Sequence, residues 1–344
     1  MNATLKKIIL KFISKENIVK IIRKVIFFRN YTDFFYNYFV DAILFYKHSA
    51  IYRLNTYQKK ESLIILRYHS IEKGLIHKPL RERFAKDKVS ELHKLLKDKD
   101  VKDNIRNSQI QVAIKILIRY YEVHRSKSID IEDYYPLDLY SNYLKLIITK
   151  EDTFKGVIDF NQETFYKDVE KNFMLFSNSR KSVRHFTGEL IDEKKIKEAI
   201  NLSLNAPSVC NRQANKVYLI DNKEKIKQIL NIQGGFLGFI ENVSQLLIVT
   251  NNRSYYYTLG ERNQFYIDGG IYFMNLLYSL HYHRIANCPA NWGKKVNAER
   301  KLTKIVSIPK NEKIICLLPI GIADEFFSVP LSKRREKEEV LFKL

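Results

Sequence analysis

Cysteine is scarce in this sequence of 344 residues, with single copies at Cys210, Cys288 and Cys316. The number is odd, the positions are far apart and no Cys-x-x-Cys pair occurs, which argues against both a disulfide framework and a thiolate metal site. This usage favours a reducing, cytoplasmic compartment. The N-terminus lacks an apolar core followed by a small-residue cleavage site, so no secretory signal is predicted.

Long apolar runs are missing as well. The longest stretch without a charged residue, Gly269–His283, contains an asparagine and two histidines, so it is too short and too polar to span a bilayer. The sequence also lacks a Gly-x-Ser-x-Gly nucleophile elbow, a P-loop and a Rossmann glycine fingerprint. With 45% hydrophobic and 28% charged residues, the composition is that of a globular protein.

Acidic residues are outnumbered, and the net charge is +21. Residues 1–150 hold 30 Lys and Arg against 16 Asp and Glu, whereas residues 151–344 hold 29 against 22. Such an excess can attract an anionic membrane, nucleic acid or an anionic substrate. Because Lys, Ile and Asn are frequent throughout, compositional bias is the alternative explanation. No nucleic-acid-binding module is recognisable, so a nucleic-acid partner is not expected.

Helical periodicity dominates the first part of the chain. Apolar residues such as Leu5 and Ile8 recur at helical spacing between lysines, and an aromatic-rich run follows over 27–46. A basic amphipathic helix of this kind either makes peripheral contact with a membrane surface or packs on its own domain. We expect an all-helical N-terminal region over 1–150 and a linker over 151–174.

The segment from Arg67 to Leu75 concentrates Arg, His, Glu and Lys within seven positions and then reaches Gly74, which could end a helix. Two interpretations stay open. One is a functional pocket or anion site, and the other is a capped helix with ion pairs along it.

Beyond residue 175 the pattern changes to a mixture of strands and helices. Asp192 is a plausible N-cap, and the stretch after Asp268 fits a buried helix whose Gly269 and Gly270 allow close backbone approach. Short apolar runs bounded by polar residues predict three buried strands, at 217–220, 246–249 and 314–318.

Four polar constellations could carry chemistry in this second part. In the first, Arg180, Lys181, Ser182 and Arg184 bring three cations and a hydroxyl within five positions, a set that can surround a phosphate. The second is the loop 205–213, whose Asn and Gln amides suit the edge of a heteroaromatic ring. The third is the loop 288–293, and the fourth is the basic cluster 332–335.

In their order and spacing, these four residue groups resemble the sequence motifs of the nitroreductase family of flavin-dependent oxidoreductases. The matching motifs are Arg180-x-Ser182-x-Arg184 followed by Phe186, the Ala-Pro-Ser-x-x-Asn-x-Gln loop over 206–213, and the C-terminal basic cluster. The resemblance covers about 175–344. It implies an α+β fold with a central, mostly antiparallel sheet flanked by helices, and a homodimer with FMN at the interface.

The resemblance also implies which residues bind the cofactor. Arg180, Lys181, Ser182 and Arg184 would hold the phosphate and ribityl chain of FMN, together with a basic pair chosen from three adjacent residues, Lys333, Arg334 and Arg335. The flavin would be lined by the loop residues Pro207, Ser208, Asn211 and Gln213. These could belong to the same subunit or to the partner subunit. The loop against the ring near N5 would be Pro289, Ala290 and Asn291.

Two features depart from the family pattern. Where the family commonly has Glu then Gly in the third loop, this chain has Asn291 then Trp292, which puts the preference for electron donor or substrate in doubt. The helical N-terminal part lies outside the standard family domain, and its Arg67–Leu75 segment looks like that of a less studied subgroup that is associated with polysaccharide biosynthesis.

The implied activity is a ping-pong transfer of hydride from NAD(P)H through flavin N5 to an electron-poor small-molecule acceptor, with no catalytic protein residue required. Two other hypotheses stay open. The same fold could support a specialised flavin oxidation of a biosynthetic intermediate, with the helical region as a lid. A non-enzymatic protein could instead use the basic N-terminal half to bind a membrane surface or nucleic acid.

Overall fold

The computed structural model describes residues 15–48, 50, 53–148, 154–256 and 258–344. The chain forms two compact units, Met1–Lys60 and Glu61–Leu344. The helix predicted around Leu5 and Ile8 lies outside the described residues. The first unit carries α2 (Lys15–His48), and no helix in the described ranges is long and apolar enough to cross a membrane.

A bundle of helices opens the second unit, as the sequence predicted. It contains α3 (Tyr57–Leu75), whose residues 57–60 are counted with the first unit, α4 (Lys86–Leu96), α5 (Lys99–Asp103), α6 (Ser108–Ser126) and α7 (Leu137–Leu146). The central helix is α6, which buries apolar side chains on nearly every side. Helix α3 runs one residue past Gly74, which has no positive φ and so does not cap it. The glycine instead leaves room for the ring of Phe84, which a Cβ would overlap.

A small antiparallel sheet joins β1 (Val157–Asn161) to β7 (Phe326–Pro330), with Val157 opposite Pro330. Strand β1 and the short helix α8 (Gln162–Tyr166) lie within the range proposed as a linker, 151–174. The position of the domain boundary stays a prediction.

The central sheet has five strands, β2 (Asn215–Ile220), β3 (Gln245–Asn252), β6 (Glu312–Gly321), β4 (Ala286–Asn287) and β5 (Ala290–Asn291). The order is β2-β3-β6-β4, with β5 also paired to β6, and every one of these pairings is antiparallel. The three predicted strands are β2, β3 and β6. The α+β class with an antiparallel central sheet is confirmed.

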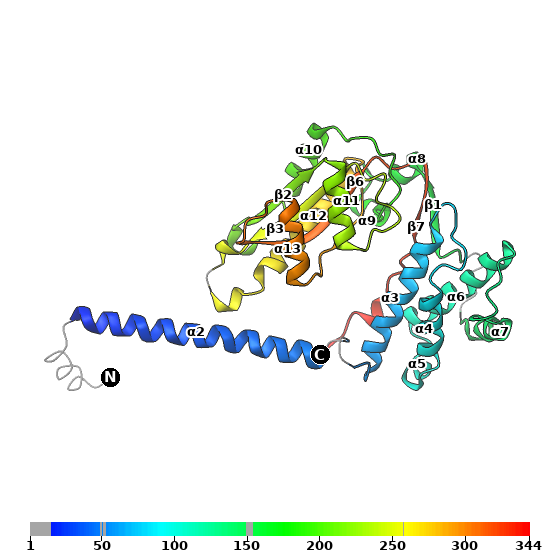
Figure 1. The fold of residues 1–344 in the computed structure, drawn as a ribbon, viewed down its shortest axis with the longest axis horizontal. Coiled ribbons are helices and arrows are strands. Elements are labelled where there is room, and N and C mark those ends of the chain that lie inside the picture. The colour runs from blue at the N-terminus through cyan, green and yellow to red at the C-terminus, as the bar shows by residue number, and fades with distance from the viewer. Residues whose placement is uncertain (1–14, 49, 51–52, 149–153, 257) are drawn as a thin grey trace. The chain divides into compact units, whose positions relative to one another are not determined.

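Helices cover both faces of this sheet (Figure 1). Helices α10 (Glu193–Ser203) and α12 (Gln264–Tyr282) share a core with Leu247 and Val249. Helices α11 (Lys223–Gln233) and α13 (Val296–Ile305) share the other core with Leu246 and Ile248. Successive residues of β3 thus point to opposite faces, and burial on both sides explains the continuous apolar run.

Helix α12 differs from the expectation of a buried helix. It begins at Gln264, so Gly269 lies inside it, where a Cβ would sit only 2.7 Å from the Ile315 side chain. Close approach is therefore confirmed at Gly269, but nothing lies near Gly270. The helix is buried on one face only, because Ile267 and Ile271 on the other face are exposed.

Candidate functional site: a cationic cavity

The first motif follows α9 (Phe173–Ser179) and has no regular secondary structure of its own. Val183 is fully buried, and its N–H donates to the carbonyl of Asn287 at 3.0 Å. Phe186 is also fully buried and packs on Gly321, where a Cβ would lie 2.7 Å from the phenyl ring. These two apolar anchors hold the segment against the central sheet, Val183 beside Asn287 of β4 and Phe186 on Gly321 of β6, while its polar residues line a cavity.

This cavity, of about 620 Å³, brings together distant parts of the chain. The first motif contributes four lining residues, Arg180, Lys181, Ser182 and Arg184, and the C-terminal basic cluster contributes Lys333 and Arg334. Further walls come from Pro289, from Met274 and Tyr278 on α12, and from His69 on α3. The structure therefore joins the first, third and fourth constellations at one place.

The electrostatic character of the cavity is uniformly positive. Among the residues that the structure describes, five that line it are Lys or Arg and none is a carboxylate. Burial lowers the pKa of Arg180, and the nearby Arg334 lowers it further. Burial and then Arg180 lower the pKa of Lys181. Cations that are crowded and desolvated in this way are stabilised by an anion placed between them.

Two guanidinium nitrogens in this cluster have no partner among the described residues. Arg180 Nη1 and Arg184 Nε are buried without a hydrogen bond there, although buried donors in proteins are almost always paired. Arg184 offers its Nη1 to the carbonyl of Ser182 at 3.4 Å, which leaves its Nε unused. Unfilled buried donors that lie beside a cationic cavity fit a ligand with several acceptor oxygens, such as a phosphate ester.

The third motif reaches the cavity only through Pro289. Ala290 and Asn291 form β5, where the Ala290 carbonyl accepts from Cys316 Sγ at 3.3 Å and that of Asn291 accepts from Gln233 Nε2 at 3.0 Å. Burial raises the pKa of the neighbouring Cys288 thiol, so this cysteine is not a thiolate.

The loop 206–213 is built separately from the cavity, and Pro207, Ser208, Asn211 and Gln213 do not line it within this chain. The Ser208 hydroxyl accepts from the Gln213 N–H at 2.9 Å. Asn211 and Gln213 both have positive φ, at 56° and 51°, a conformation that non-glycine residues rarely adopt. Backbone strain of this kind is concentrated at functional sites.

Comparison with known proteins bears directly on these motifs. Residues 178–246 match the model of the nitroreductase family. The predicted resemblance to the nitroreductase family is confirmed. The matched nitroreductase segment contains the first motif and the loop 206–213, whereas the third and fourth motifs lie beyond it.

Three solved structures are similar over about half of the chain. A nitroreductase family protein from Clostridium difficile 630 is 17% identical, with a TM-score of 0.42, covering 50% of this chain and 99% of that one. An FMN-dependent nitroreductase from Clostridium difficile R20291 is also 17% identical, with a TM-score of 0.39 and coverage of 48% and 92%. A nitroreductase family protein from Clostridium novyi NT is 18% identical, with a TM-score of 0.39 and coverage of 45% and 86%. No curated protein matches the sequence significantly.

Sequence reasoning missed His281, which lies behind the first motif of this nitroreductase segment. Its Nε2 is 2.7 Å from Ser179 Oγ, next to Arg180. Burial, helped by Arg180 and Lys181, lowers the pKa of His281 to about 4, so its ring is neutral at pH 7. The only signal was its place on the predicted helix after Asp268.

The contribution of α3 was foreseen only as one of two open interpretations. His69 lines the cavity, and burial together with Arg184 lowers the pKa of Lys73. The other interpretation holds as well, because His69 Nδ1 lies 2.9 Å from Glu72 Oε2 within the same helix. Helix α3 is thus both internally paired and part of the site.

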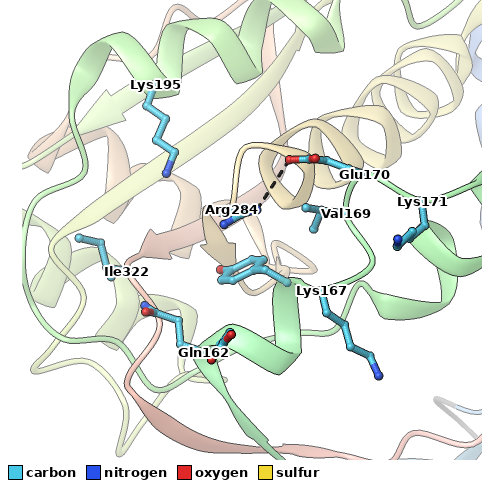
Figure 2. Close-up of a pocket in the computed structure, with 10 residues that line it drawn as sticks. Gln162, Lys167, Val169, Glu170, Lys171, Lys195, Arg284 and Ile322 are labelled. Atoms are coloured by element: carbon cyan, nitrogen blue, oxygen red, sulfur yellow. Dashed lines mark ion pairs between the residues drawn. The ribbon is translucent and has the colours of Figure 1, made fainter.

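A second cavity, of about 690 Å³, lies around α8 and has mixed charge (Figure 2). Arg284 there is already paired with Glu170 at 3.7 Å, and Glu163 adds another carboxylate. Three lysines complete its charged lining, namely Lys167, Lys171 and Lys195. Carboxylates among the cations make this cavity a poorer site for a phosphate dianion than the first.

Proposed function

We propose that this chain is an FMN-dependent oxidoreductase that passes hydride from NAD(P)H to an electron-poor small molecule. The observation that carries the proposal is the cationic cavity, in which Arg180 and Arg184 present buried guanidinium nitrogens that have no partner among the described residues. A phosphate monoester is the ligand chemistry that these donors fit.

The phosphate and ribityl chain of FMN would be held by two cationic walls. Arg180, Lys181, Ser182 and Arg184 form one wall, and Lys333 and Arg334 form the other. Bound FMN would supply two-electron chemistry at N5, in a ping-pong cycle with the nicotinamide and the acceptor. The protein binds and orients the nucleotide, and no side chain is required as nucleophile or general base.

A homodimer is part of the proposal, and the outer face of α12 supports it. Ile267, Ile271 and Met274 are exposed at helical spacing, and Met274 also lines the cavity. An apolar stripe that continues into the cavity wall suits a second copy of the chain. In such a dimer the loop residues Pro207, Ser208, Asn211 and Gln213 would line the partner's flavin.

The dimer can be tested with Ile271→Arg, which places a charge in the centre of the stripe. We expect a monomer by light scattering and an FMN affinity reduced at least tenfold, since half of the flavin lining would be lost. Val296→Arg, at an exposed apolar position on α13, is the matched control and should remain dimeric. A variant that stays dimeric with unchanged affinity would exclude this face.

The reaction is tested by stopped-flow spectroscopy of the FMN-loaded protein without oxygen. We expect the visible absorbance of the oxidised flavin to bleach on mixing with NADH or NADPH, and to return when a quinone or nitroaromatic compound is added. A bound flavin that neither nicotinamide reduces would refute the oxidoreductase proposal.

Helix α2, considered by itself, supports peripheral contact with an anionic membrane surface as a second role. Fifteen large apolar or aromatic side chains on it are exposed. Its first half also carries exposed Lys20, Arg23, Lys24 and Arg29 against a single acid, Glu16. Aromatic rings combined with cations favour the interface of a negatively charged bilayer.

The membrane role is tested by sedimentation with vesicles. Binding should require anionic lipid and should decrease as salt rises from 0.05 to 0.5 M, because cations at the surface are screened. Equal binding to neutral vesicles, or none to either kind, would contradict it.

A further inference from the structure

The C-terminal residues Leu331–Arg335, here called the strap, are fixed on both sides of Lys333 and Arg334. On the N-terminal side, the Leu331 N–H donates to the Gly156 carbonyl at 3.2 Å, and the Ser332 N–H donates to Glu72 Oε1 at 3.3 Å. On the C-terminal side, Arg335 donates to both carboxylate oxygens of Glu61, at 3.1 and 2.8 Å. Lys333 and Arg334 lie between these attachments and line the cavity.

Both carboxylates that hold the strap belong to α3, and both are buried. Glu72 is fully buried and Glu61 is 5% exposed. Residues Ser332 and Glu72 are 260 positions apart in sequence, and Arg335 and Glu61 are 274 apart. Figure 1 shows the C-terminal tail, in red, beside α3. Burying a carboxylate costs free energy unless the group is well paired. Two buried carboxylates that both bond the strap therefore indicate that they hold it in position.

We infer that Glu61 and Glu72 are positioning residues for the flavin phosphate, because they hold the strap so that Lys333 and Arg334 face the cavity. This inference rests on the proposed function. It assigns Arg335 to the anchor on α3, and it leaves Lys333 and Arg334 as the basic pair at the phosphate. The helical region thereby becomes a structural part of the cofactor site.

The inference predicts that FMN affinity changes in the direction opposite to the one that Coulomb attraction alone would give. Glu61→Gln removes a negative charge near an anion site, so Coulomb attraction alone would make FMN bind more tightly. If the carboxylate holds the strap, its loss removes this ion pair from Arg335 and loosens Lys333 and Arg334. FMN then binds more weakly, by about tenfold.

The experiment compares full-length variants by FMN titration and by hydrogen exchange of the strap without FMN. Glu61→Gln should weaken FMN binding and speed exchange at 331–335. The charge swap Glu61→Arg with Arg335→Glu should restore both to within about threefold of the parent protein, since the ion pair is remade in reverse. Glu122→Gln, at an exposed carboxylate of α6 paired with Arg119, is the matched control and should change neither.

The outcomes separate the strap from the proposed function. Tighter or unchanged FMN binding in Glu61→Gln, or unchanged exchange at 331–335, would contradict the inference that Glu61 positions the strap. Failure of the swap to restore FMN binding would also overturn it, because Arg335 would then be acting on the phosphate itself. If the parent protein does not bind FMN, the proposed function fails, and exchange at 331–335 alone decides whether α3 holds the strap.

Discussion

The two cationic walls of the cavity are built in different ways. The first motif is anchored by its own apolar residues, Val183 and Phe186, which are buried in the sheet core within a few positions of the cations they place. The strap follows β7, whose Phe327 and Val329 are buried in the same core, but its own residues are half-buried or exposed. Beyond the strand it is held by a backbone bond to Gly156 and by Glu61 and Glu72, which are distant in sequence. The first wall is thus a local property of the sequence, and the second depends on the tertiary fold.

The largest expected effect concerns the first wall. Arg184→Ala removes a buried guanidinium whose Nε has no partner among the described residues, so FMN affinity should fall about 100-fold. Isothermal titration measures this, with Arg300→Ala on the exposed face of α13 as the matched arginine control. An unchanged dissociation constant for Arg184→Ala would show that the first wall does not bind FMN.

The packing behind the first wall predicts how stability depends on pH. The pKa of His281 is about 4 in the folded protein, so the unfolded chain binds a proton there first as pH falls below about 6.5. The free energy of unfolding should therefore decrease by about 2 kcal/mol between pH 7 and pH 5 from this residue alone. Urea denaturation should show a smaller decrease for His281→Gln.

His283→Gln, at the end of the same helix, is the matched control for the removal of a histidine from α12. If His281→Gln and the parent protein lose the same stability between the two pH values, the ring is not held neutral behind Arg180.

A smaller effect is expected at the second wall, because Arg334 is exposed. Arg334→Gln should weaken FMN binding about fivefold at low salt, and the difference should shrink in 0.5 M salt, where exposed charges are screened. The effect of Arg184→Ala should persist at both concentrations. Equal salt dependence of the two variants would contradict the distinction between the walls.

Sequence patterns predicted the parts of the fold that are encoded locally. Strand β3 was recognisable because burial on both faces requires a continuous apolar run, and Asp192 does cap α10 by accepting from the Lys194 N–H at 2.9 Å. Helix α12 was predicted as buried, whereas one of its faces is exposed. Because uncharged residues occupy both faces of this helix, the sequence does not show which face is buried in the core and which is an exposed apolar stripe.

The site followed the same rule. The first motif could be recognised from a few adjacent residues, whereas the choice among Lys333, Arg334 and Arg335 could not be made from sequence. That choice depends on Glu61, a helix residue with no local sign of its partner. His281 was missed for the same reason, since its contact with Ser179 joins two segments about 100 residues apart.

The central claim, that separate cationic segments converge on the phosphate of a flavin nucleotide, is tested most directly by comparing FMN with riboflavin. The two ligands differ only in the phosphate. Titration followed by flavin fluorescence should show FMN binding at least 100-fold more tightly, because the phosphate pairs with several partly buried cations. Equal affinities, or no binding of either flavin, would contradict the account.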